Sequence, residues 1–410
     1  MPRGIRFALK LTATRRLVYS LGLMLLFWAI YDGLISFFTP VFITNLGFST
    51  TSLGLIIAFQ SVTGAVFDFF ISRYLKKSHY LKIFIIIFLL SFLYPLVLYS
   101  SRSLPLLLLA MAHWGLYYDL LAFAIFNFVS RHSRRHEHCQ NISIIGIFKT
   151  VGYLLAPAIA SWTLIASTTS FTNLLVAYLF LVISAIIFVV FYSLSGDTPA
   201  INSEKPPLCP KNFTAEFSLW LKIGRILLPV LLFNLLICLS DYFFWTLGPI
   251  FFGTSSSATH LNGLFMVAYS LPVLLVSWFA EKITHKVGKK RTAYASFFLS
   301  SLILLSLYIV KAPYLIIFLI FASSVFSSLA WPSIKGAYVD YLTETSNVEK
   351  EIEGLTDFST NIGQIIGPIL AGVLAQSFGL AHAFSLLALI NIIAVLFLVV
   401  ITPKAITVRV

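Results

Sequence analysis

The sequence has 410 residues, of which 59% are hydrophobic and only 10% are charged, and its mean hydropathy is +0.94. A water-soluble domain carries nearer a quarter charged residues, so these apolar residues cannot all belong to a soluble core. The formal net charge of +13 would allow nucleic-acid binding. The basic residues lie in the loops between apolar segments. This placement excludes the class of nucleic-acid-binding proteins.

The apolar residues fall into runs that are long enough to cross a bilayer, which takes about 20 residues per helix. The predicted spans cover residues 17–42, 52–74, 81–100, 104–129, 141–166, 172–194, 225–252, 260–280, 290–310, 313–338, 355–377 and 381–402. The expected fold class is therefore all-α integral membrane, with 12 transmembrane helices.

The basic residues predict the orientation of these helices. Of the 28 Lys and Arg, all but Arg102, Lys149 and Lys311 fall on the side of the N-terminus. By the positive-inside rule, both termini are expected in the cytoplasm, and the protein is expected in the cell (plasma or inner) membrane. The basic loops would then contact anionic lipid headgroups, and no nucleic-acid partner is expected.

The sequence contains an internal repeat that relates its two halves. Asp32 and Pro40 in the first half correspond to Asp241 and Pro249 in the second, and the offset of 209 residues also relates the Gly-Leu pairs that begin at Gly54 and Gly263. A repeat of half the chain with acids inside apolar segments is typical of alternating-access transporters. The expected domains are an N-terminal six-helix bundle (1–194), a cytoplasmic linker (195–222) and a C-terminal six-helix bundle (223–410).

Basic motifs in two corresponding loops carry a family resemblance. The loop after the second span offers Gly64-x3-Asp68 followed by Arg73, Lys76 and Lys77, and the loop after the eighth offers Glu281 followed by Gly288-Lys289-Lys290-Arg291. With twelve helices in two repeats and a long central linker, the chain resembles the major facilitator superfamily. That resemblance implies two pseudo-symmetric six-helix bundles.

A glycine-rich segment in the eleventh span resembles one subgroup of this superfamily. Gly363-x3-Gly367-Pro368-x2-Ala371-Gly372 is similar to an element of drug–proton antiporters. Antiporters carry this element in their fifth helix. In this chain the fifth span has only a weaker version, which begins at Gly152. Glycines at this spacing also allow close packing of helices, which is the alternative interpretation for Gly363, Gly367, Pro368 and Gly372.

Two acids within apolar spans are the main candidates for chemistry. An ionised carboxylate near the bilayer centre costs about 2.5–3.5 kcal/mol, so it persists when paired, protonated or facing water. In the family fold, the helices that carry Asp32 and Asp241 line the central cavity, which implies a shared site for proton exchange and substrate. Trp28 and Trp245 lie one turn from these acids, and Asn234 shares the face of Asp241. The alternative is that each acid caps a helix kinked near its proline, Pro40 or Pro249, or accepts a fixed hydrogen bond.

Asp119 and Lys149 form a second candidate cluster. They lie at similar depth in the fourth and fifth spans, so an ion pair between them is expected, either a switch or a permanent bridge. His113 is a candidate proton relay or a packing residue.

The acids and bases at the cytoplasmic helix ends are expected to act as a conformational gate, because a carboxylate there can contact the positive N-terminus of another helix. The alternative is that they only determine topology. The predicted gate residues are Gly64, Asp68, Arg73, Glu281, Lys286, Asp340 and Asp357.

Together these features predict a secondary active transporter, proton-coupled and favouring efflux of a drug-like or cationic solute. The alternative is a symporter that takes up a sugar or other metabolite. No enzyme is expected, because the sequence has no HExxH, GxSxG, P-loop or metal-ligand spacing. We expect no cofactor and no metal; the expected partners are a small-molecule substrate, protons and the lipid bilayer, and the protein is expected to be a monomer.

Overall fold

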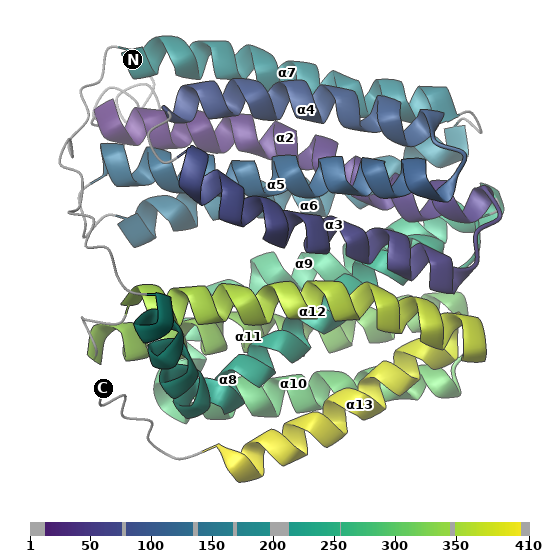
Figure 1. Cartoon of the computed structure of the whole chain (residues 1–410). Coiled ribbons are helices and arrows are strands. Elements are labelled where there is room, and N and C mark those ends of the chain that lie inside the picture. The colour runs from purple at the N-terminus through teal and green to yellow at the C-terminus, as the bar shows by residue number, and fades with distance from the viewer. Residues whose placement is uncertain are drawn as a thin grey trace, which may run out of the picture. The chain divides into compact units, whose positions relative to one another are not determined.

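A computed structural model describes residues 13–75, 79–133, 138–166, 170–196, 213–254, 256–344 and 349–402. Within these ranges the chain forms twelve long α-helices and two short 3₁₀ helices (Figure 1). The helices of the first half are α2 (Ala13–Asn45), α3 (Thr50–Tyr74), α4 (Tyr80–Ser100), α5 (Leu104–His132), α6 (His138–Ala166) and α7 (Ser170–Gly196). Those of the second half are α8 (Phe213–Leu247), α9 (Ser256–Val287), α10 (Lys289–Leu305), α11 (Pro313–Glu344), α12 (Glu349–Phe378) and α13 (Leu380–Ile401), with η2 (Gly248–Ile250) after α8 and η3 (Ser306–Tyr308) after α10.

These helices confirm the predicted all-α membrane fold. In the described ranges, eleven helices are long and apolar enough to cross a membrane, and the shorter apolar segment His260–Val276 lies within α9. The apolar runs of the sequence placed most helix ends within a few residues. The largest difference is the start of α8, which begins at Phe213, inside the stretch 195–222 that was expected to be a linker.

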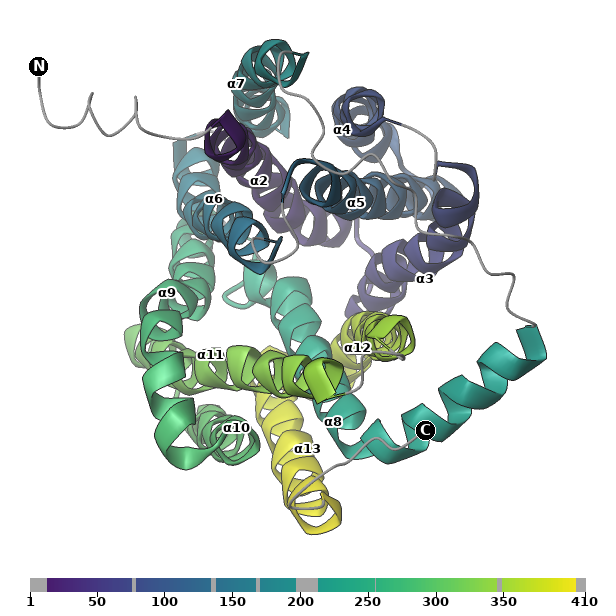
Figure 2. The ribbon, with the colours of Figure 1, turned by 90° about the vertical axis from the view of Figure 1, so that its left-hand side faces the viewer.

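Helix α8 changes direction along its length. Figure 2 shows that its first turns run at a steep angle to the remainder of the helix. Pro229 lies inside α8, and a proline removes one backbone hydrogen bond and crowds the preceding turn. Proline is therefore a sufficient cause of the bend.

The chain divides into two compact units. The first comprises Met1–Phe42 and Val62–Pro207, and the second comprises Ile43–Ser61 and Leu208–Val410. The end of α2 and the first turns of α3 thus group with the second unit. The domain boundaries expected from the sequence, at 194 and 223, do not include this exchange.

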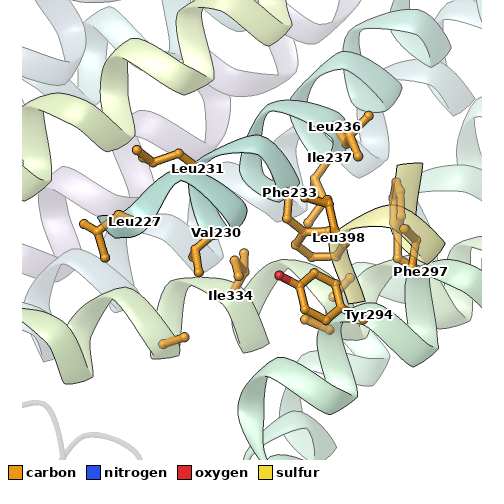
Figure 3. Close-up of a cluster of buried hydrophobic side chains, with 14 of the residues drawn as sticks. Leu227, Val230, Leu231, Phe233, Leu236, Ile237, Tyr294, Phe297, Ile334 and Leu398 are labelled. Atoms are coloured by element: carbon orange, nitrogen blue, oxygen red, sulfur yellow. The ribbon is translucent and has the colours of Figure 1, made fainter. Parts of the chain in front are cut away.

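The second unit has an apolar core between α8, α10, α11, α12 and α13 (Figure 3). Phe233 of α8 meets the rings of Tyr294 and Phe297 on α10 edge-on, with ring centroids 4.6 and 5.4 Å apart. Leu398 of α13 and Ile334 of α11 belong to the same cluster. Helices α8 and α10 therefore meet through these aromatic rings.

The outer surface of the bundle helices is apolar. Along α7, exposed side chains recur every three or four residues, which places them on one face of the helix. These residues are Leu175, Leu179, Val182, Ile186, Val189 and Val190. A continuous exposed apolar stripe is what a helix facing lipid requires.

The two units repeat one close helix contact. A Cβ built on Gly152 of α6 would lie 2.5 Å from the Leu26 carbonyl oxygen of α2, and one on Gly363 of α12 would lie 2.6 Å from the Leu235 carbonyl oxygen of α8. Leu26 and Leu235 are separated by the same 209 residues as Asp32 and Asp241. Each unit therefore packs its fifth helix against its first through a glycine at the same place.

Candidate functional site

Asp32 lies on α2 inside the first unit and is only 1% exposed. Both of its carboxylate oxygens accept hydrogen bonds from tyrosines on other helices. The hydroxyl of Tyr117 on α5 donates to Oδ1 at 2.7 Å, and that of Tyr153 on α6 donates to Oδ2 at 2.8 Å. These two hydrogen bonds offset part of the free-energy cost of removing a carboxylate from water.

Large aromatic side chains surround this acid. Trp28 donates its indole N–H to the Ser91 hydroxyl on α4 at 3.2 Å and meets the Tyr117 ring edge-on at 6.0 Å. Tyr31 donates to the Ser91 carbonyl oxygen. Trp28 therefore packs among α4 and α5 and supports Tyr117, whereas the sequence had suggested a role in binding substrate.

Trp114 is the one member of this group with an unused donor. Its indole N–H approaches Asp32 but makes no hydrogen bond with any atom in the described ranges. The side chain is 7% exposed.

Lys149 on α6 lies near Asp32, an acid that the sequence did not pair it with. Its ammonium is within electrostatic range of Asp32 and sits 5.6 Å from the centre of the Tyr118 ring. A Cβ on Gly64 of α3 would lie 2.3 Å from the Oδ2 atom of Asp119, so this carboxylate packs directly against α3.

His113 on α5 has a packing role in this structure. Its Nε2 lies 2.9 Å from the Leu90 carbonyl oxygen on α4, so that nitrogen donates to the backbone. The imidazole stacks nearly parallel to the Tyr94 ring, with centroids 6.5 Å apart. This is the packing alternative of the two that the sequence left open.

Asp241 occupies the corresponding place on α8 in the second unit, in a different environment. Its Oδ1 accepts a hydrogen bond of 2.6 Å from the hydroxyl of Tyr269 on α9. The Tyr269 ring stacks on Phe244 with centroids 4.2 Å apart and planes 8° from parallel. Asp241 is half-buried, so it is more accessible than Asp32.

A cavity of about 360 Å³ adjoins Asp241 and lies wholly within the second unit. Its lining includes seven serines from α8, α10 and α11, together with Asn391 of α13 and Trp331 of α11. The serines are Ser240, Ser300, Ser301, Ser323, Ser324, Ser327 and Ser328. Within the described part of the chain, no lysine, arginine or histidine lines this cavity.

Trp245 and Asn234 are not part of that lining. The tryptophan beside the cavity is Trp331, which the sequence did not single out. The amide nitrogen of Asn234 donates to the hydroxyls of Ser359 at 2.8 Å and Thr360 at 2.9 Å, both on α12. Asn234 therefore links α8 to α12.

Most of the predicted gate falls on side chains outside the described set. Asp68, Arg73, Glu281 and Asp340 lie within α3, α9 and α11, but their side chains are not described. Of the other gate residues, Lys286 and Asp357 are exposed and Gly64 is buried against Asp119.

The glycine-rich segment of α12 packs against two helices. Gly367 adjoins the Leu239 carbonyl oxygen of α8, and a Cβ there would lie 2.6 Å from it. Farther along, the Thr50 hydroxyl at the start of α3 donates to the Gly372 carbonyl oxygen at 3.2 Å. The Pro368 carbonyl oxygen lies 2.2 Å from where a Cβ on Gly54 would stand. Helix packing thus occupies Gly363, Gly367, Pro368 and Gly372.

Sequence reasoning missed the tyrosine donors Tyr153 and Tyr269 and the serine-lined cavity. One signal was present, because Ser323-Ser324-x2-Ser327-Ser328 places four hydroxyls on about one side of an otherwise apolar helix. In the described ranges, no group of three or more His, Cys, Asp or Glu could hold a metal ion.

Comparison with known proteins agrees with this fold. The family model described as Major Facilitator Superfamily matches residues 19–246 and 230–409. No curated protein sequence gives a significant match.

Several solved transporters share the fold at low sequence identity. The nucleoside transporter NupG is 13% identical with a TM-score of 0.68, and the match covers 95% of this chain and 99% of that one. A bacterial homologue of the human lysosomal transporter Spinster is 15% identical with a TM-score of 0.67, covering 95% of each chain. The peptide transporter POT is 12% identical with a TM-score of 0.70, covering 94% of each.

Proposed function

Since the chain belongs to the Major Facilitator Superfamily, we propose that it is a proton-coupled secondary active transporter that moves a small organic solute by alternating access. The favoured direction is efflux, and the favoured solute is drug-like or cationic. The protein binds protons and the solute. It works as a monomer in the cell membrane, with both termini in the cytoplasm.

One observation carries the proposal: the first helix of each half holds a carboxyl group inside an apolar helix, and each group accepts a hydrogen bond from a tyrosine. Burying an ionised carboxylate in a bilayer costs about 2.5–3.5 kcal/mol. A carboxyl group in that position gains from taking up a proton or a cation. This is the property that coupling to a proton gradient requires.

Uptake of a sugar or other metabolite by symport is the second candidate. The serine hydroxyls around Asp241 favour it, because they could bond the hydroxyls of such a solute. Two of the solved transporters of similar fold are a nucleoside transporter and a peptide transporter, which also agrees with a metabolite as solute.

Transport by purified protein in liposomes with an imposed pH gradient tests the proposal. We expect solute flux that requires the gradient and disappears when a protonophore collapses it. Asp32→Asn and Asp241→Asn should each abolish gradient-driven flux while the protein still elutes as a single species in gel filtration. Gradient-driven flux that is undiminished in both variants would contradict proton coupling through these acids.

A further inference from the structure

The cavity of the second unit is rich in hydrogen-bond acceptors. Most of its serines already donate their hydroxyl hydrogen within the protein: Ser301 to the Phe297 carbonyl oxygen at 2.8 Å, and Ser323 to the Ser300 carbonyl oxygen at 2.9 Å. Ser324 donates to the Tyr269 carbonyl oxygen. A hydroxyl has one hydrogen and two lone pairs, so these oxygens retain only acceptor capacity.

Two buried polar atoms of the lining have no hydrogen-bond partner among the described residues. They are Oδ1 of Asn391 and Oγ of Ser328, whose side chains are 2% and 5% exposed. The Asn391 amide nitrogen donates to the Ser240 hydroxyl at 3.0 Å, and in this orientation the amide oxygen is the atom without a partner. Buried polar atoms without partners are rare in native structures and call for a ligand or water.

The charge of the cavity is also uncompensated. Tyr269 bonds one oxygen of Asp241, and among the described residues the other oxygen has no recorded partner. Among the side chains that the structure describes, none that lines the cavity is basic. Asp241 in an apolar helix therefore requires either a proton or a cation from outside the protein.

The remaining walls are apolar, and four of their residues are aromatic. The Phe244 and Tyr269 rings stack beside the carboxylate, and Phe297 and Trp331 also line the cavity. The other apolar lining residues are aliphatic: Ile237, Val273, Leu304 and Pro332. Aromatic faces attract cations and cover apolar groups. A volume of about 360 Å³ lies at the small end of ligand sites and suits a molecule with a single ring.

We infer that this cavity binds a small organic ammonium ion, with its charge on Asp241, its N–H groups on Asn391 Oδ1 and Ser328 Oγ, and its apolar part against the aromatic walls. The inference rests on the proposed transport function, which it deepens by naming the class of solute. The ammonium ion and the proton are then alternative occupants of one carboxyl group. A solute that displaces the proton is the arrangement that exchange transport needs.

Equilibrium binding to purified protein in lipid nanodiscs tests the inference without transport. The probe is radiolabelled phenethylamine, a primary ammonium ion with one ring. Two analogues serve as competitors: phenethyltrimethylammonium keeps the charge but has no N–H, and 2-phenylethanol has the ring without the charge. We expect saturable binding of phenethylamine, weaker competition by the quaternary ion, and little competition by the alcohol.

Variants assign the binding to the cavity. Asp241→Asn should weaken binding about tenfold or more, because it removes the charge. Ser328→Ala should weaken it about three- to tenfold, as loss of one hydrogen bond does. Ser333→Ala is the matched control, because Ser333 is a buried serine on the same helix that bonds its own backbone and does not line the cavity.

The inference is overturned if phenethylamine shows no saturable binding at millimolar concentration, or if 2-phenylethanol competes as well as phenethylamine. Equal affinity in Ser328→Ala and Ser333→Ala would also overturn it, even if Asp241→Asn fails to fold. Binding without gradient-driven flux would leave the site standing and contradict only the transport proposal. Gradient-driven flux of a neutral solute without amine binding would support the transport proposal and contradict the ammonium site.

Discussion

The surroundings of Asp32 and Asp241 differ although the two acids hold corresponding places in a repeat. Around Asp32 the neighbouring helices contribute large rings, including Trp114 and Tyr117 of α5. Around Asp241 the corresponding helix α11 contributes serines, and a cavity of about 360 Å³ results. Large side chains fill the space around an acid and hold it in a fixed set of hydrogen bonds. Small hydroxyl side chains leave room for a ligand.

The two acids also differ in their counter-charges. Lys149, three residues before Gly152 on α6, acts on Asp32. Three residues before Gly363 on α12 stands Thr360, whose hydroxyl accepts from Asn234 at 2.9 Å. The first unit therefore carries its own cation, and the second unit lacks one at the same point of the repeat. We infer that the first site is built to keep its acid in place and the second to receive a cation.

The largest effect is expected when a ring beside Asp32 is replaced by the kind of side chain found beside Asp241. Tyr117→Ser should lower the free energy of unfolding by about 3–5 kcal/mol, because it opens a cavity among buried rings and removes a donor from Oδ1. The measurement is the shift of the thermal unfolding midpoint in detergent. Tyr117→Phe, which keeps the ring, should lose less than half as much; an equal loss would show that the hydroxyl, not the volume, matters.

A double-mutant cycle tests which acid Lys149 serves. Lys149→Ala and Asp32→Asn should be coupled by about 1–3 kcal/mol, since either change alone leaves a buried group without its counter-charge. Lys149→Ala combined with Asp119→Asn is the control and should be additive. Coupling to Asp119 in place of Asp32 would contradict the described arrangement.

The shared glycine contact predicts equal effects in the two units. Gly152→Ala and Gly363→Ala should each lower stability by about 1–3 kcal/mol, because the added Cβ meets a backbone carbonyl oxygen that cannot move aside. Gly146→Ala on α6 is the control, since a Cβ there has no neighbour within 4 Å. Destabilisation of only one unit would show that the repeat in sequence is not a repeat in packing.

The smallest effect is expected at Ser91. Ser91→Ala removes the hydroxyl that accepts from Trp28 at 3.2 Å and should cost about 1 kcal/mol. Ser193→Ala, an exposed serine on α7, should leave the unfolding midpoint unchanged. A loss well above that of one hydrogen bond would indicate that Ser91 organises the whole aromatic group.

The sequence predicts the fold well, because apolar length and the repeat of Asp32 and Asp241 depend on local pattern. It paired Lys149 with Asp119 from their depth in the membrane, and it did not pair Lys149 with Asp32. Helical spacing indicates this second neighbour: Lys149 and Gly152 share a face of α6, and Gly152 packs on α2, the helix that carries Asp32.

The cavity could not be predicted in the same way. Its volume is the space left by side chains from α8, α9, α10, α11 and α13, and no single segment specifies it. The hydrogen bonds of Tyr153 and Tyr269 likewise depend on how neighbouring helices are rotated about their axes, which periodicity leaves open.

Binding of phenethylamine to Asp32→Asn and Asp241→Asn, side by side in nanodiscs at one pH, tests the difference between the two acids most directly. If the second unit receives the cation, Asp32→Asn keeps the affinity of the unaltered protein within about threefold and Asp241→Asn loses about tenfold or more. Full binding in Asp241→Asn together with lost binding in Asp32→Asn would contradict the assignment of the site.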